Sequence, residues 1–249
     1  MTEQAKPAFN EWKQPVGAPL PGWEERPRPQ GVALEGRYCR LEPVDAARHG
    51  ADLFAAYAQA PDGSDWTYMM SGPFADLAAY LAYAETLQRS ADPLHYAVVD
   101  LASGRAVGTM ALMRIEPRHG AIEVGHIALS RQLKRTRVAT EAQFLLMRHV
   151  FAQLGYRRYE WKCDSLNAPS RQAAQRLGFS FEGIFRQAVV YRGRSRDTAW
   201  FSIIDGEWPV LQGAFERWLD PANFDSEGRQ RQSLLAFRLA LATAATSAA

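Results

Sequence analysis

A strand-to-helix junction in the second half of the chain carries three cations. Lys134, Arg135 and Arg137 stand where an apolar run ends and a helix is expected to begin near Val138. The first turn of a helix presents backbone N–H groups without intrahelical partners, and the helix dipole adds partial positive charge there. Amides and cations together suit a phosphate, so the junction predicts an anion-binding site. A solvated helix end with surface cations is the alternative, and the junction alone does not decide between the two.

A glutamate and a histidine precede the junction on the same expected strand. Glu123 and His126 are both residue types that can take a proton from a substrate. Regular alternation along a strand would place His126 on the opposite face from Glu123. The residues that share the face of Glu123 would be Gly125, Ile127 and Leu129. The alternatives are a carboxylate paired with an arginine and a histidine satisfied in the core.

Further polar and aromatic residues could contact a ligand. The run Asn167-Ala-Pro-Ser170 opens a short helix, where the Ser170 hydroxyl either donates a proton to a leaving group or makes only a local hydrogen bond. Trp66 and Tyr68 follow a loop rich in turn-forming residues, and Tyr191 precedes the last hairpin turn. These aromatic rings could contact a substrate or pack in the core.

The spacing of apolar and turn-forming residues predicts the elements that position these groups. Strands are expected at 38–41, 95–100, 106–115, 121–129, 156–163, 179–191 and 197–204. Helices are expected from Asp45, from about Pro73, over 138–154 and over 169–177. Because short turns join several consecutive strands, the fold is expected to be α/β, with a mixed, largely antiparallel central sheet flanked by helices on both faces.

Composition separates a central domain from two tails. Residues 1–34 form a Pro-rich arm that is not expected to fold as a unit, 35–220 form the domain, and 221–249 form an extension with an Ala-rich tail. Within that tail, a helix is expected at 233–241. Since aromatic residues in the arm need a surface to cover, a homodimer is one expectation.

Charge and cysteine content exclude several classes of protein. With 29 Lys and Arg against 27 Asp and Glu, the formal charge of +2 argues against a dedicated nucleic-acid binder. Two cysteines make no disulfide framework, and no spacing indicates a metal site. No apolar run has the length of a membrane span, and the polar start lacks a signal sequence, so a cytoplasmic location without membrane contact is expected.

The junction and the short helix together resemble the GNAT superfamily of acetyl-CoA-dependent N-acetyltransferases, over roughly residues 35–205. Lys134-Arg-Thr-Arg-Val-Ala139 occupies the position of the family's Gln/Arg-x-x-Gly-x-Gly/Ala motif, and Asn167-x-x-Ser170 is followed by a matching Ala-x-x-Leu-Gly-Phe run. Thr140-Glu-Ala142 is similar to the RimJ/RimL branch, which acetylates the N-terminal alanine of ribosomal proteins. Arg135 and Arg137 replace glycines of the motif, and we expect their guanidinium groups to compensate by binding phosphate oxygens.

The resemblance implies a role for each matched residue. The coenzyme would be acetyl-CoA, with no metal, and the acceptor would be a primary amine on a peptide or small molecule. Glu123 would be the base, and Ser170 would protonate the departing thiolate. Contacts to the coenzyme would come from the following residues: Ile127, Ala128, Leu129, Lys134, Arg135, Thr136, Arg137, Val138, Ala139, Thr140, Asn167 and Ser170. Contacts to the acceptor would come from Trp66, Tyr68, His126 and Tyr191.

Two other functions fit the same fold. A non-catalytic acyl-CoA-binding module would keep the phosphate site without turnover, but the presence of both Glu123 and Ser170 favours an enzyme. A ribosome- or RNA-associated protein would fit the arginine-rich runs, but the near-neutral net charge speaks against it.

Overall fold

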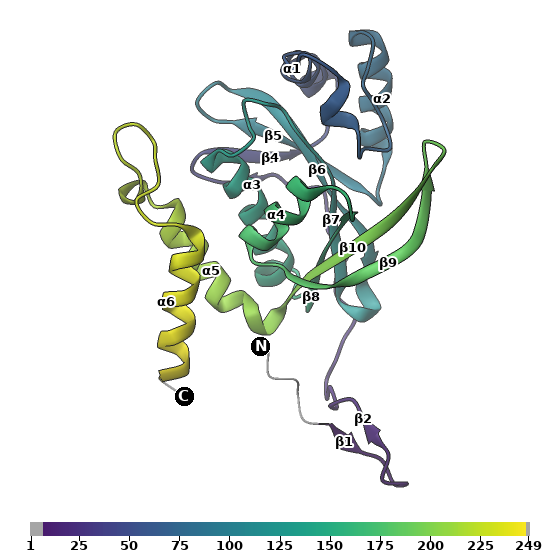
Figure 1. The fold of residues 1–249 in the computed structure, drawn as a ribbon, viewed down its shortest axis with the longest axis vertical. Helices are drawn as coiled ribbons and strands as arrows, with labels where there is room; N and C mark the ends of the chain where they lie inside the picture. Colours follow the sequence, from purple (N-terminus) through teal and green to yellow (C-terminus); the bar gives the residue numbers. More distant parts are fainter. Residues whose placement is uncertain (1–6, 248–249) are drawn as a thin grey trace.

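A computed structural model describes residues 7–247 and shows one large twisted sheet with helices on both faces (Figure 1). The sheet has eight strands in the order β3-β4-β5-β6-β7-β8-β10-β9. Its strands are β3 (Leu34–Glu35), β4 (Cys39–Pro43), β5 (Leu94–Asp100), β6 (Arg105–Glu116), β7 (Ala121–Leu129), β8 (Arg158–Asp164), β9 (Ser180–Tyr191) and β10 (Arg194–Ile204). Neighbouring strands pair antiparallel except β7 and β8, which run parallel. The expected mixed, largely antiparallel sheet is therefore confirmed.

Two groups of helices cover the two faces of the sheet. The helices are α1 (Ala46–Tyr57), α2 (Leu77–Arg89), α3 (Arg137–Arg148), α4 (Ala168–Leu177), α5 (Trp208–Leu219) and α6 (Leu234–Ser247). The side chains of β5 alternate between the two cores: Tyr96 and Val98 pack with α3, whereas Ala97 and Val99 pack with α1 and α2. This alternation explains why β5 reads as a continuous apolar run, because both of its faces are buried.

The helix ends follow local capping chemistry. Asp45 caps α1 by accepting from the N–H of Arg48 at 2.9 Å, as the sequence predicts. Helix α2 begins at Leu77 rather than near Pro73, because Asp76 caps it by accepting from the N–H of Ala79. Helix α3 is extended by a π-helical turn, His149–Gln153, and the chain then turns at Gly155 with φ of 69°.

The C-terminal part departs from expectation. Helix α5 was not expected from the sequence, yet it buries Trp208, Phe215 and Trp218 against the core that α3 also covers. Helix α6 packs along α5 and runs to Ser247, beyond the expected end at residue 241. None of the helices in the described part of the chain is long and apolar enough to cross a membrane.

The N-terminal arm contains a small hairpin despite its prolines. Strands β1 (Ala8–Phe9) and β2 (Pro15–Val16) pair antiparallel and project from the body of the protein (Figure 1). The arm joins the body at Trp23, whose indole N–H donates to the carbonyl of Arg118 at 3.0 Å. Residues 1–6 of the expected arm lie outside the described residues.

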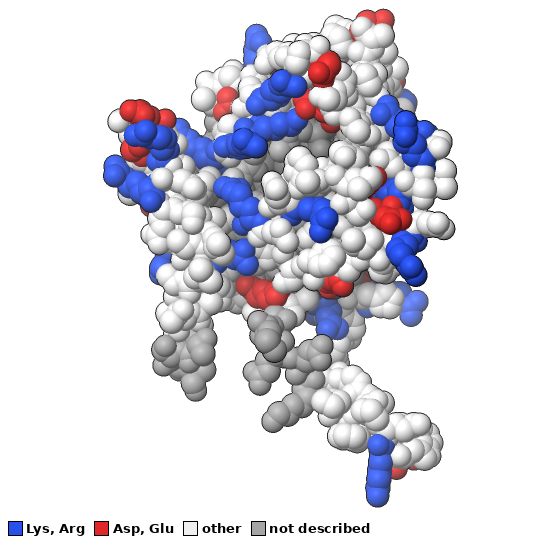
Figure 2. All heavy atoms as spheres, viewed as in Figure 1, with Lys and Arg blue, Asp and Glu red and all other residues white. Residues whose placement is uncertain are grey.

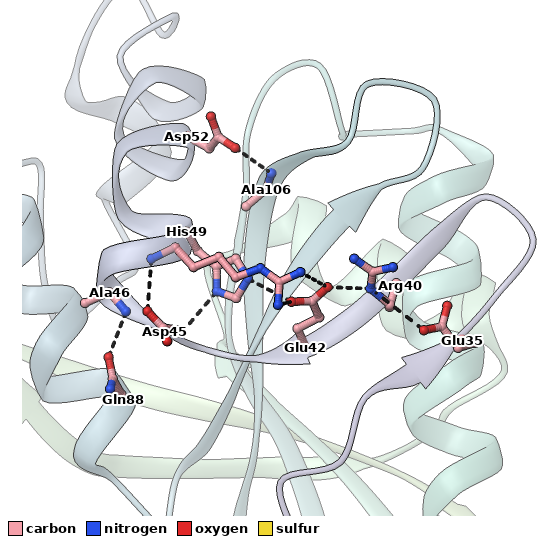
Figure 3. A network of polar contacts seen from close by, with 10 residues as sticks. Glu35, Arg40, Glu42, Asp45, Ala46, His49, Asp52, Gln88 and Ala106 are labelled. Atoms are coloured by element: carbon pink, nitrogen blue, oxygen red, sulfur yellow. Dashed lines mark hydrogen bonds and ion pairs between the residues drawn. The ribbon is translucent and has the colours of Figure 1, made fainter.

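A polar network joins β4 to α1 at the edge of the sheet (Figure 3). The buried Glu42 carboxylate accepts from Arg40, from Arg48 and from Nε2 of His49, the last at 3.1 Å. His49 Nδ1 in turn accepts from the N–H of Asp45 at 3.1 Å. Burial raises the pKa of Glu42, but the hydrogen bonds from Arg40 and His49 and the charges of Arg40 and Arg48 outweigh it and hold the pKa below its usual range. The polar groups of this network are paired with one another, and together they fix α1 against the sheet.

A second buried carboxylate fixes α3 to the sheet. Glu141 accepts from three consecutive backbone N–H groups, those of Arg37, Tyr38 and Cys39, at 2.6–2.8 Å. These amides belong to the chain that enters β4, so they have few other acceptors. The start of α3 is therefore held in one position relative to the central strands.

Candidate active site

The parallel strands β7 and β8 separate halfway along their length. They pair from Ala121 opposite Arg158 to Val124 opposite Trp161, and no further. Beyond that point β7 continues to Leu129 and β8 to Asp164. The separation opens a cleft of about 1580 Å³, larger than most small-molecule pockets. Its walls come from β7, β8, the start of α3, α4, the loop at residues 64–70, the β9–β10 hairpin and residues 218–230.

The start of α3 forms one end of this cleft. Thr136 caps the helix, since its hydroxyl oxygen accepts from the N–H of Ala139 at 3.1 Å. Among the described residues, nothing accepts from the N–H groups of Arg135, Arg137 or Val138. Arg135 has a left-handed backbone with φ of 63°, a conformation that glycine adopts without strain. Three unpaired amides at the start of a helix fit a phosphate.

Cations surround this end of the cleft, which we call the mouth. Arg137 is held there by aromatic rings, with its guanidinium carbon 4.6 Å from the centre of Tyr38 and 5.5 Å from that of Phe224. Neither Arg135 nor Arg137 has a carboxylate within 4.0 Å in the described structure. Lys134 differs, because its ammonium pairs with Asp65 at 2.6 Å. Figure 2 shows Lys and Arg side chains gathered over this region and over α4.

The strand β7 supplies the middle of the cleft. Ile127, Ala128 and Leu129 line it, as the sequence predicts for coenzyme contacts. Of the predicted residues on α3, Ala139 and Thr140 also line the cleft. Val138 does not, and its side chain packs against the main core.

The start of α4 places Asn167 and Ser170 on the wall opposite β7. Asn167 caps α4, with Oδ1 accepting from the N–H of Ser170 at 3.2 Å. The Ser170 hydroxyl accepts from the indole N–H of Trp161 at 3.0 Å, which leaves its own proton to be donated, and the Cys163 thiol is one neighbouring acceptor. Both residues line the cleft. The two are brought together with the mouth, as the sequence predicts.

Glu123 lies in the cleft, on the part of β7 that is still paired with β8. Its carboxylate is 4% exposed and lies 2.9 Å from the ammonium of Lys162 and 3.2 Å from Nε of Arg114. Burial raises the pKa of Glu123, and the two cations oppose that rise. A buried carboxyl with a raised pKa is suited to take and release a proton near neutral pH. Lys162 was not predicted as a site residue. It alternates with the aromatic residues Tyr159 and Trp161 along β8, so it lies on the opposite face of the strand.

His126 departs from regular strand geometry. Between Gly125, which pairs with Ala111, and Ala128, which pairs with Thr109, β7 has one residue more than β6. His126 sits in this bulge with φ of 48°, so the expected alternation from Glu123 to Leu129 is wrong beyond Gly125. His126 lines the cleft, and burial lowers its pKa, so the ring is neutral at pH 7.

The three aromatic residues that were predicted to contact the acceptor amine occupy different positions relative to the cleft. Tyr68 lines the cleft and donates its hydroxyl to the carbonyl of Leu166 at 3.2 Å. Trp66 also lines it but is only 6% exposed, because its ring packs edge-on against Tyr57 and Phe74. Tyr191 is not among the residues that line the cleft, although its hydroxyl donates at 2.9 Å to Asp164, which does line it.

Helix α5 and the C-terminal extension contribute residues that were not predicted. Trp218, Phe224 and Arg229 line the cleft beside Arg176 of α4. The Arg176 guanidinium lies 5.2 Å from the centre of the Trp218 ring and donates to the Thr140 hydroxyl at 3.1 Å. No local motif marks these residues, because folding of the extension against α4 brings them to the mouth.

Comparisons with known proteins agree with this geometry. The profile of the acetyltransferase (GNAT) domain matches residues 39–180, more than half of the chain. The crystal structure of a GCN5-related N-acetyltransferase from Brucella melitensis is 50% identical, with a TM-score of 0.86, and the match covers 88% of this chain and 99% of that one. The uncharacterized N-acetyltransferase p20 of Bacillus licheniformis is 26% identical over 161 residues, which cover 64% of this chain and 89% of p20.

A more distant match bears on the fold alone. RimL, a ribosomal L7/L12 α-N-protein acetyltransferase solved with coenzyme A, is 18% identical with a TM-score of 0.56. The match covers 70% of this chain and 99% of RimL.

Proposed function

Because the chain belongs to the GNAT acetyltransferase family, we propose that it transfers an acetyl group from acetyl-CoA to a primary amine by direct attack. The observation that carries the proposal is the separation of β7 from β8 beside the unpaired amides of α3. When bound, acetyl-CoA supplies a thioester, whose acyl carbon an amine can attack.

The residues of the mouth fit the phosphates of the coenzyme. The N–H groups of Arg135, Arg137 and Val138 have no acceptor within the described structure, and two of these residues add guanidinium groups without carboxylate partners. Arginine binds phosphate oxygens through two parallel hydrogen bonds, which compensates for the missing glycines. Ile127, Ala128 and Leu129 offer an unpaired strand edge to the rest of the coenzyme, and Asn167 faces them from α4.

Proton movement is assigned to two side chains. Glu123 takes a proton from the acceptor amine, directly or through water, because an ammonium has no lone pair for attack. A Cβ at Gly125 would clash with Sδ of Met113, whereas Oε1 of Glu123 would lie at an ordinary contact distance of 3.4 Å. The Ser170 hydroxyl donates its proton to the departing thiolate, and its hydrogen bond from Trp161 orients it for this step.

The acceptor is either a protein N-terminus or a small-molecule amine. The Thr140-Glu-Ala142 run supports a relationship to the ribosomal-protein alanine branch. The fold likeness to RimL is compatible with that relationship but adds nothing specific to it. The cytoplasmic location, the homodimer and the domain boundaries stay predictions.

Two measurements test the proposal. Isothermal titration should detect binding of acetyl-CoA, and binding should weaken as salt is raised, because phosphate contacts are screened. A thiol-release assay with a panel of amines, with products identified by mass spectrometry, should then detect acetylated product. If millimolar acetyl-CoA produces neither a heat of binding nor a shift in the melting temperature of the protein, the proposal is refuted.

A further inference from the structure

Apolar side chains lie beside the Glu123 carboxylate and the lysine that pairs with it. Met113 pairs with Glu123 across the β6–β7 ladder. The Trp200 ring covers the ammonium of Lys162 at 3.8 Å, and that ammonium contacts Glu123. Phe185 stacks on Trp200 with ring centres 4.4 Å apart and is 55% exposed. These three residues, Met113, Phe185 and Trp200, form an apolar wall of the cleft next to the proposed base.

Two of the three carboxylates among the described residues that line the cleft are paired with cations of the protein, and the third is occupied by hydrogen bonds. The three are Asp65, Glu123 and Asp164. Asp65 and Glu123 each pair with two cations. Asp164 is buried and accepts from a tyrosine hydroxyl and a backbone N–H. A second ammonium on an acceptor would therefore find no free carboxylate, and would meet the surrounding lysines and arginines instead.

One cation of the same region does lack a carboxylate. Arg196 of β10 lines the cleft, and its Nε donates to the hydroxyl of Thr198 at 3.1 Å. Thr198 pairs with Phe185 of the apolar wall and with Asp164 at the end of β8. Among the described residues, Arg196 has no acidic side chain within 4.0 Å. Its fork of N–H donors is available to an anionic group of a bound molecule.

We propose that the acceptor is an amino acid with an aromatic or other apolar side chain, whose carboxylate binds Arg196 and whose body packs on the apolar wall. Polyamines and aminoglycosides are disfavoured, because every carboxylate in the described cleft lining is already occupied by cations or, for the buried Asp164, by two hydrogen bonds. This inference rests on the proposed acetyltransferase function and goes beyond it by naming the acceptor class. The chemistry itself is unchanged: a nitrogen–acyl bond forms, the thioester bond breaks, and the amine proton passes to Glu123.

A matched panel of acceptors tests the inference. Thiol release is measured with phenylalanine, phenylethylamine, spermidine and kanamycin, on the wild type and on Arg196→Gln. We expect kcat/KM for phenylalanine to exceed that for spermidine and kanamycin by at least about tenfold, the equivalent of one lost charge-assisted contact. Arg196→Gln should lower kcat/KM for phenylalanine about tenfold and leave phenylethylamine, which lacks the carboxylate, nearly unchanged.

The controls separate this inference from the function on which it rests. Arg194→Gln, on the same strand but outside the cleft wall, should behave as wild type with all acceptors. Faster turnover of spermidine or kanamycin than of phenylalanine would overturn the acceptor class while leaving the acetyltransferase proposal intact. Equal losses for phenylalanine and phenylethylamine in Arg196→Gln would remove Arg196 from carboxylate binding. A chain that binds no acetyl-CoA and acetylates none of the amines would overturn the proposed function, and this inference with it.

Discussion

Replacing Arg135 by glycine should separate the backbone role of this residue from its charge. The left-handed conformation of Arg135, with φ of 63°, costs a residue with a Cβ about 1–2 kcal/mol. Glycine removes that cost but gains about 0.5–1 kcal/mol of conformational entropy in the unfolded chain. We therefore expect Arg135→Gly to change the free energy of unfolding by about 0–1.5 kcal/mol, in the stabilising direction.

The same substitution should weaken coenzyme binding. A charge-assisted hydrogen bond contributes about 1.5–3 kcal/mol when it is shielded from water. Because Arg135 is exposed, solvent screening should reduce this to about 1 kcal/mol, or about a fivefold higher Kd for acetyl-CoA. Arg135→Asn is the matched control, since asparagine tolerates the left-handed conformation but carries no charge. It should lose the same affinity as the glycine variant.

Denaturant unfolding and isothermal titration at low and high salt measure the two effects independently. The difference in Kd between wild type and both variants should shrink at high salt, because it arises from charge. An unchanged Kd for acetyl-CoA at low salt would refute the phosphate role of Arg135. A glycine variant destabilised by more than about 1 kcal/mol would refute the account of backbone strain.

Three further substitutions test the core and the chemistry. Glu141→Gln should lower the free energy of unfolding by about 2–3 kcal/mol, because an amide cannot accept from three N–H groups as a carboxylate does. Denaturant titrations measure this loss, and Glu216→Gln, at an exposed glutamate, is the control that should have no effect. Glu123→Gln should lower kcat/KM by about a hundredfold, most strongly between the raised pKa of Glu123 and the pKa of the acceptor amine, where the carboxylate is ionised and the acceptor still needs a base. At lower pH the wild type should lose its advantage as Glu123 is protonated, and a pH profile identical to that of the wild type would contradict the assignment. Ser170→Ala should lower kcat more than it lowers the affinity for acetyl-CoA, and an unchanged kcat would remove Ser170 from the mechanism. The same substitution should lower the free energy of unfolding by about 1–2 kcal/mol, because it leaves the indole N–H of Trp161 unpaired.

Local signals in the sequence predicted most of the fold. Asp45 and Gly178 mark helix ends by capping chemistry, and the structure places them at those ends. The hairpins around β6 follow from short turns rich in glycine. Helix α5 was missed, although Trp208, Leu211, Phe215 and Trp218 have helical spacing that would have revealed it.

Features that depend on pairing between strands could not be read from one segment. The bulge at His126 arises because β7 has one residue more than β6 between two ladder pairs, which is a property of register. The separation of β7 from β8 is likewise invisible in either strand alone. The contact of Lys162 with Glu123 depends on which strands are neighbours in the sheet. The contact of Arg176 with Trp218 depends on the packing of a helix that is distant in the sequence.

Because β7 stops pairing with β8 halfway along, a segment of unpaired strand backbone lies in the middle of the sheet rather than at its edge. A ligand lying along Gly125–Leu129 would take the place of the missing strand, and the sheet would be continuous only in the loaded protein. Hydrogen exchange should register this directly, with slowed exchange of amides in this segment after addition of acetyl-CoA and no comparable change along β4, which is paired on both sides. The coenzyme would then act as a structural part of the domain as well as a reactant.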